Sequence, residues 1–212
     1  MKLYTYFRSS AAFRVRIALN LKGVSYEPVL VHLAKGEHRQ PQYAQVNPQA
    51  LLPTLELDDG TRLTQSLAII EWLDEKHPAP LLIPKDTLAR ARVRSLSYLI
   101  ASEIHPLNNL RVLQHLKRAL GQSQEQIDEW YRYWIADGLA KLEAELARAG
   151  TGKFSHGDLP GMADCCLVPQ IFNAKRYNSE LKPYPKTMRV FDNCMQLDAF
   201  DRAQPSKQPD AE

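Results

Sequence analysis

The chain has 212 residues and 44% of them are hydrophobic, so it is long enough to bury one large core or two smaller ones. Its 27 basic and 24 acidic side chains leave a formal net charge of only +3 and are dispersed, which excludes nucleic acid as the expected partner. No segment approaches the ~18 apolar residues that span a bilayer, and Arg8 interrupts the N-terminus, so we expect no membrane partner and a cytoplasmic protein.

The first predicted elements are a strand, a turn and a helix. Met1 to Phe7 is short, apolar and β-prone, whereas Ala11 to Lys22 has apolar residues at helical spacing and precedes Gly23, which favours helix ends. The turn carries Ser9 and Ser10. Either hydroxyl can cap the helix, and the N–H groups of its first turn carry about half a positive charge. The pair therefore predicts either a structural cap alone or a site for an anion such as a thiolate.

The following segments predict a mixed sheet. Residues 24–33 alternate imperfectly and predict a second strand parallel to the first, and residues 42–46 predict a short helix. Residues 51–57 and 61–64 are expected to be strands joined by a tight hairpin at Asp59–Gly60. Ser66 is expected to cap a helix that ends near His77–Pro78. The order β-α-β-α-β-β-α is that of a thioredoxin-like domain, which we place at residues 1–80.

The rest of the chain is predicted to be helical. Residues 81–86 contain prolines without periodicity and are expected to form a linker, and residues 87–212 an all-helical domain. The expected helices are residues 88–120, kinked at His105–Pro106, then 124–149, 163–177 and 187–198. A polar tail after Gln204 is expected to be loosely held. The predicted fold class is an α/β N-terminal thioredoxin-like domain plus an all-α C-terminal domain.

The three cysteines do not predict a metal or disulfide site. Cys165, Cys166 and Cys194 are odd in number and lack the spacing of metal ligands. We therefore expect no bound metal, and we interpret the adjacent pair as filling the buried face of a helix.

Pro53 begins a predicted strand and leaves one question open. About 95% of X-Pro bonds in folded proteins are trans, which favours an ordinary strand-entry proline. A cis bond would instead turn the N–H and C=O of Leu52 outward toward a bound peptide.

Several motifs extend over essentially the whole chain. They are Arg8-Ser9-Ser10, residues 14–19, Asn47-Pro48, residues 65–71, Ala163-Asp164, residues 167–170 and residues 183–185. Together they resemble the zeta class of the glutathione transferases. The sequence departs from the class at Ala11 and Ala12, where its members have Cys and Ser. The resemblance implies the glutathione transferase fold and a homodimer.

The resemblance also implies glutathione as the cofactor. Ser9, supported by Ser10, is then the hydroxyl that stabilises the thiolate of glutathione. The residues that match the class positions for binding the tripeptide are Ser9, Ser10, His38, Leu52, Pro53, Gln65, Ser66, His105 and Asn109. Judged alone, each of three residues also has a structural interpretation. Ser66 would be a helix cap, and His38 would be a solvated loop histidine. His105 would be a packed residue at the kink, with Asn108 or Asn109 one turn away.

The zeta class includes isomerases of maleylacetoacetate and maleylpyruvate. The resemblance therefore implies a glutathione-dependent cis–trans isomerase of a maleyl-type diketo acid in aromatic amino acid or aromatic acid catabolism. A small anionic substrate with two carboxylates calls for fixed cations, and Arg8, Arg111 and Arg176 are the candidates, although each could be a solvated surface arginine. The alternatives are a general transferase or α-haloacid dehalogenase, and a non-catalytic transferase-like binding module.

Overall fold

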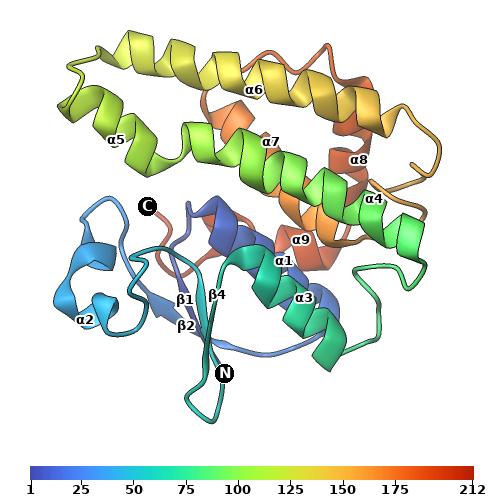
Figure 1. Ribbon diagram of the computed structural model, residues 1–212, viewed down its shortest axis with the longest axis horizontal. Helices are drawn as coiled ribbons and strands as arrows, with labels where there is room; N and C mark the ends of the chain where they lie inside the picture. The colour runs from blue at the N-terminus through green and yellow to red at the C-terminus, as the bar shows by residue number, and fades with distance from the viewer. The chain divides into compact units, whose positions relative to one another are not determined.

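The computed structural model describes residues 1–212 and divides into two compact units, which Figure 1 shows coloured along the chain. The first unit contains Met1–Ile83 and Met195–Glu212, and the second contains Pro84–Cys194. This division differs from the expected helical domain at residues 87–212, because the last segment packs on the N-terminal unit. Asn20, for example, donates a side-chain hydrogen bond to the Ala199 carbonyl at 2.9 Å.

A four-stranded sheet with the order β2-β1-β3-β4 forms the centre of the first unit. Its strands are β1 (Lys2–Thr5), β2 (Glu27–Leu30), β3 (Thr54–Glu56) and β4 (Arg62–Thr64). β1 is parallel to β2, as the crossover pattern predicts, and it is antiparallel to β3. Thr54 lies opposite Thr64 in the antiparallel β3–β4 pair, which confirms the hairpin predicted at Asp59–Gly60.

Helices cover both faces of this sheet. The helices of the first unit are α1 (Ser10–Lys22), α2 (Pro41–Ala44), α3 (Ser66–Lys76) and α9 (Asp198–Asp201). α1 and α3 pack against each other on one side, and α2 lies on the other side (Figure 1). Leu3, Leu55 and Ile70 are completely buried between sheet and helices, so this hydrophobic core fixes the start of α1 relative to the sheet.

A buried ion pair ties the predicted linker to the first unit. Lys22 Nζ lies 2.5 Å from the carboxylate of Asp74 and also donates to the carbonyls of His77 and Pro80. Asp74 in turn accepts the backbone N–H groups of Leu82 and Ile83. The chain after α3 is therefore held by a fully hydrogen-bonded charge pair, which a buried ion pair requires.

The second unit is helical, as predicted, but its first helix is not continuous. Its helices are α4 (Thr87–Tyr98), α5 (Leu110–Arg118), α6 (Gln124–Leu146), α7 (Met162–Arg176) and α8 (Pro185–Met195). Between α4 and α5 the chain forms a π-helical turn (Leu99–Ile104) and a 3-10 turn (His105–Asn108). The prediction of one kinked helix over residues 88–120 is therefore wrong. Pro106 lacks the N–H that a continuous helix needs, and the Asn109 side chain caps a new helix by accepting a hydrogen bond from the Arg111 N–H at 3.1 Å.

The prediction of a loosely held tail after Gln204 is also wrong. The Phe7 N–H donates to Asp210 at 3.0 Å, and His32 Nε2 lies 2.8 Å from the Glu212 carboxylate. The tail supplies acceptors for groups at the edge of the first unit, which no local pattern in the tail indicates. A short 3-10 helix, Pro205–Lys207, precedes these contacts.

The position of the cysteines agrees with the sequence analysis. All three cysteines are free and buried, and Cys165 and Cys166 lie within α7, which confirms that the pair fills a buried helix face. None of the helices combines the length and the hydropathy that a bilayer-spanning segment needs.

Candidate active site

The turn after β1 places two hydroxyl groups at the start of α1. Ser9 is the N-cap, with φ −71° and ψ 110°, and its Oγ accepts the Ala12 N–H at 3.2 Å. Ser10 is the first helical residue, and both serines are buried. Because the Ser9 oxygen is the acceptor in the cap, its hydroxyl proton is left to donate to an anion. The structural cap and the anion site are therefore compatible functions of one side chain.

Arg8 lies directly before these hydroxyls and is exposed. Its guanidinium carbon is 4.7 Å from the centre of the Phe7 ring, a cation–π distance. The Phe7 ring therefore restricts the orientation of the Arg8 guanidinium, a positive charge next to the serine pair.

A second candidate site for an anion lies at the start of α3. The expected cap, Ser66, is instead the first helical residue, and Gln65 occupies the cap position without capping through its side chain. Gln65 has a φ of 67°, which is uncommon for a residue with a Cβ and clusters at ligand-binding positions. Since no side chain caps α3, the N–H groups of its first turn have no side-chain partner and can bind a carboxylate.

Arg14 contributes to this second site, which the sequence analysis did not predict. Its Nη1 donates to Ser66 Oγ at 3.3 Å, and its side chain is almost completely buried. No pattern within α1 indicates this contact, because Arg14 and Ser66 are 52 positions apart in the sequence.

His38 and Leu52 present polar groups without partners. His38, in the 3-10 turn Glu37–Arg39, is buried, and its Nδ1 has no hydrogen-bond partner, so the solvated-loop interpretation is wrong. Burial, and secondarily Arg39, lowers the pKa of the His38 imidazole, which favours its neutral form. The Leu52–Pro53 peptide is cis, and the Leu52 backbone N–H and C=O make no hydrogen bond within the protein. Buried polar groups of this kind need partners, and a peptide-like ligand fits that need.

Four predicted site residues belong to the second unit. His105 and Asn109 are adjacent, with Asn109 Nδ2 3.2 Å from His105 Nε2. Arg111 is exposed in the first turn of α5, and Arg176 is exposed in the last turn of α7, where it lies 5.1 Å from the Tyr177 ring centre. The approach of these four side chains to Ser9 stays a prediction.

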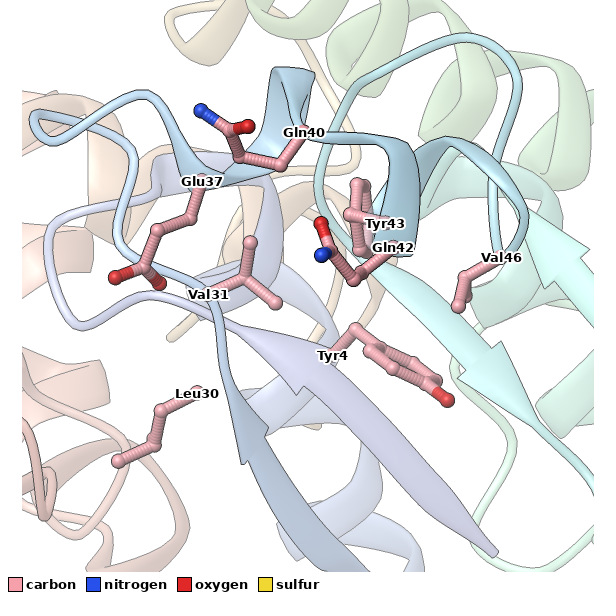
Figure 2. Close-up of a pocket in the computed structure, with 8 residues that line it drawn as sticks. All are labelled: Tyr4, Leu30, Val31, Glu37, Gln40, Gln42, Tyr43 and Val46. Atoms are coloured by element: carbon pink, nitrogen blue, oxygen red, sulfur yellow. The ribbon is translucent and has the colours of Figure 1, made fainter.

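A separate pocket of about 300 Å³ lies between the sheet and α2. Figure 2 shows its lining residues, which are Tyr4, Leu30, Val31, Glu37, Gln40, Gln42, Tyr43 and Val46. The hydroxyls of Tyr4 and Tyr43 are already bonded, to Glu56 at 3.2 Å and to the Leu51 carbonyl at 2.7 Å. None of the predicted site residues lines this pocket, so it is distinct from the serine site.

Comparison with known proteins identifies the family. Residues 3–81 match the family model for the N-terminal domain of glutathione S-transferase. The chain is 47% identical to the maleylpyruvate isomerase of a Ralstonia species, over 100% of both chains. It also matches a solved holo structure of maleylpyruvate isomerase, described as a bacterial glutathione S-transferase of the zeta class, with a TM-score of 0.97 and 46% identity over 100% of both chains. This chain belongs to the zeta class of the glutathione S-transferases.

A further solved structure bears on the cofactor of this zeta-class protein. It is the maleylacetoacetate isomerase of Methylobacterium extorquens AM1 with bound malonate and glutathione, which has a TM-score of 0.97 and 41% identity over 100% of both chains. The predicted glutathione transferase fold is confirmed, and glutathione is the cofactor of this class. At the class positions for Cys and Ser, this chain has Ala11 and Ala12 in the first turn of α1, so Ser9 and Ser10 are the hydroxyls that the turn supplies.

Proposed function

We propose that this zeta-class protein is a glutathione-dependent cis–trans isomerase that converts maleylacetoacetate or maleylpyruvate to the fumaryl isomer, in aromatic amino acid or aromatic acid catabolism. The observation that carries the proposal is the 47% identity to maleylpyruvate isomerase over the whole chain, with a serine hydroxyl retained at the start of α1. The names of the relatives favour this function over a general transferase, a dehalogenase or a non-catalytic module.

The task of Ser9 is to stabilise an anion at the N-terminus of α1. Glutathione, when bound, supplies a thiol whose anion is the nucleophile for reversible addition to a conjugated double bond. A free thiol has a pKa of about 8.5, so little thiolate exists at neutral pH without help. A hydroxyl donor and the α1 dipole together favour the anion, and each unit of pKa requires only about 1.4 kcal/mol. Ser10 supports this role from the first helical position.

The groups described above divide among the parts of the tripeptide. The N-terminus of α3, with Gln65, Ser66 and Arg14, suits the γ-glutamyl carboxylate, because dipole and guanidinium are both positive there. The unpaired backbone of Leu52 before Pro53 suits the cysteinyl unit. His38 suits the glycyl end, and we assign His105 and Asn109 of the second unit to the same cofactor.

Arg8, Arg111 and Arg176 are proposed to bind the carboxylates of a small anionic substrate. Arginine suits this task because its planar fork binds carboxylates bidentately and keeps its charge. The related structure from Methylobacterium extorquens contains malonate, a dicarboxylate, together with glutathione. Alanine variants of the three arginines are expected to raise the KM for the substrate, whereas Arg148→Ala, which removes an exposed arginine paired with Glu145, is the matched control and is expected to leave it unchanged.

The deciding experiment follows the ultraviolet absorbance of maleylpyruvate and of maleylacetoacetate with the purified protein, with and without glutathione. Isomerisation of at least one substrate is expected only with glutathione, and the ratio of the two kcat/KM values assigns the preferred substrate. Equal activity without glutathione would overturn the proposal.

We also propose that the protein is a cytoplasmic homodimer, in which residues 1–80 bind glutathione and the second unit, Pro84–Cys194, binds substrate. Light scattering after size exclusion should then give twice the chain mass of 24.2 kDa. Cell fractionation should recover the protein with the cytosolic fraction. A monomeric mass or a membrane-pellet location would contradict the respective part of this proposal.

A further inference from the structure

The backbone of Phe7, which immediately precedes Arg8 and Ser9, is bound by two charged side chains. Arg16, on the first turns of α1, is fully buried, and its Nη2 donates to the Phe7 carbonyl at 3.1 Å. On the other side, the Phe7 N–H donates to Oδ2 of Asp210 at 3.0 Å. The N–H and the C=O of Phe7, which lies immediately before the serine turn, are therefore each hydrogen-bonded to a charged side chain.

Arg16 also reaches the backbone of Ser9 through one shared carbonyl. Its Nη1 donates to the Tyr6 carbonyl at 3.3 Å, and the Ser9 N–H donates to the same oxygen at 2.9 Å. The geometry thus joins the guanidinium to the serine turn by two successive hydrogen bonds. Displacement of Arg16 would move the acceptor that fixes the Ser9 backbone.

The same guanidinium connects β1 to the C-terminal segment. Its Nε donates to the Ala203 carbonyl at 3.1 Å, and its Nη1 donates to Thr5 Oγ1 at 3.0 Å. Burial lowers the pKa of Arg16 to about 10, although Tyr26 and, to a smaller extent, Asp210 act to raise it, and the group stays charged at neutral pH. A buried cation of this kind needs a nearby anion, and Asp210 supplies one.

Asp210 has no other function visible in the structure. Its Oδ1 is buried without a hydrogen-bond partner, so the C-terminal segment itself does not satisfy the carboxylate. Leaving this oxygen without a partner costs free energy, yet the position lets the carboxylate accept the Phe7 N–H and interact electrostatically with Arg16. The neighbouring acid Asp201, in contrast, binds Gln204 and Lys207 within its own segment.

We propose that Arg16 and Asp210 are positioning residues that clamp the Phe7 peptide and thereby set the direction of the Ser9 hydroxyl toward the thiol of glutathione. The inference rests on the proposed role of Ser9. Neither residue is catalytic, since each acts through the Phe7 and Tyr6 backbone. A small displacement of a donor weakens a hydrogen bond to an anion, so a clamp two residues away affects the stabilisation of the thiolate.

The test compares Asp210→Ala and Asp210→Asn with the wild type and with Asp201→Asn as the matched control. The pH dependence of thiolate absorbance in the glutathione complex gives the pKa of the bound thiol, and thermal melting reports the fold. Asp210→Ala is expected to raise the thiol pKa by about one unit, which leaves severalfold less thiolate at neutral pH. Asp210→Asn retains an acceptor for the Phe7 N–H but loses the charge, so its shift is expected to be smaller. Asp201→Asn should behave as the wild type.

The outcomes separate this inference from the proposed function. A wild-type thiol pKa in Asp210→Ala refutes the clamp even if the melting temperature falls, because a purely structural role lowers stability alone. If Asp210→Ala does not fold, an unchanged thiol pKa in Asp210→Asn refutes the clamp instead. A wild-type complex without a lowered thiol pKa refutes the role of Ser9 itself, and the clamp with it.

Discussion

The substitution Ser9→Ala separates two contributions of one oxygen atom. The Ser9 Oγ accepts the Ala12 N–H at 3.2 Å, so its removal costs the cap of α1, about 1 kcal/mol of folding free energy. For a chain of this size, that loss corresponds to a fall in melting temperature of about 2–4 °C. The hydroxyl is also the proposed donor to the thiolate, and a hydrogen bond to a charged group contributes about 1.5–3 kcal/mol. The pKa of bound glutathione should therefore rise by about one to two units.

The assay records thiolate absorbance of the glutathione complex from acidic to alkaline pH, together with the melting temperature. Ser9→Thr keeps the oxygen in both functions and should retain most of the thiolate at neutral pH. The reasoning is refuted if Ser9→Ala lowers the melting temperature as expected but keeps the wild-type midpoint of the thiolate titration. The serine would then be a cap only.

Three further predictions concern stability. Asp74→Asn removes the anionic partner of the buried Lys22 and should destabilise the fold by about 3–5 kcal/mol in urea titrations, with part of the loss regained when Lys22→Met is added. Gly138→Ala would place a Cβ 2.3 Å from Cγ1 of Ile104 and should cost about 1–3 kcal/mol, less in an Ile104→Ala background; an unchanged melting temperature would contradict the packing. Burial lowers the pKa of His38 below its ordinary value of 6.5 in the folded protein. As the pH falls through 6.5, the unfolded chain therefore binds a proton at this imidazole before the folded protein does. The free energy of unfolding should decrease with falling pH until the pH passes below the pKa of His38 in the folded protein. His38→Gln should flatten this decrease, and NMR titration of the imidazole checks the direction.

The sequence predicted the elements whose signals are local. The strand and helix on either side of Ser9, the Asp59–Gly60 hairpin and the helical second half follow from side-chain periodicity and turn residues within a few positions. The same reasoning was wrong where neighbouring signals compete. Residues 88–120 have one amphipathic pattern, but Pro106 and the cap at Asn109 break the helix. Ser66 has the preferred chemistry of a cap, yet Gln65 occupies that position.

The sequence by itself determined that a serine hydroxyl caps the start of α1, because Ser9 and the helix that it caps are adjacent in the chain. Only the tertiary structure decided what surrounds that site. Phe7 and Asp210 are 203 positions apart, and Arg14 and Ser66 are 52 apart, so no local pattern encodes either contact. Hydrogen bonds within a turn are set by neighbouring residues, whereas contacts between distant segments form only when the shared core brings those segments together.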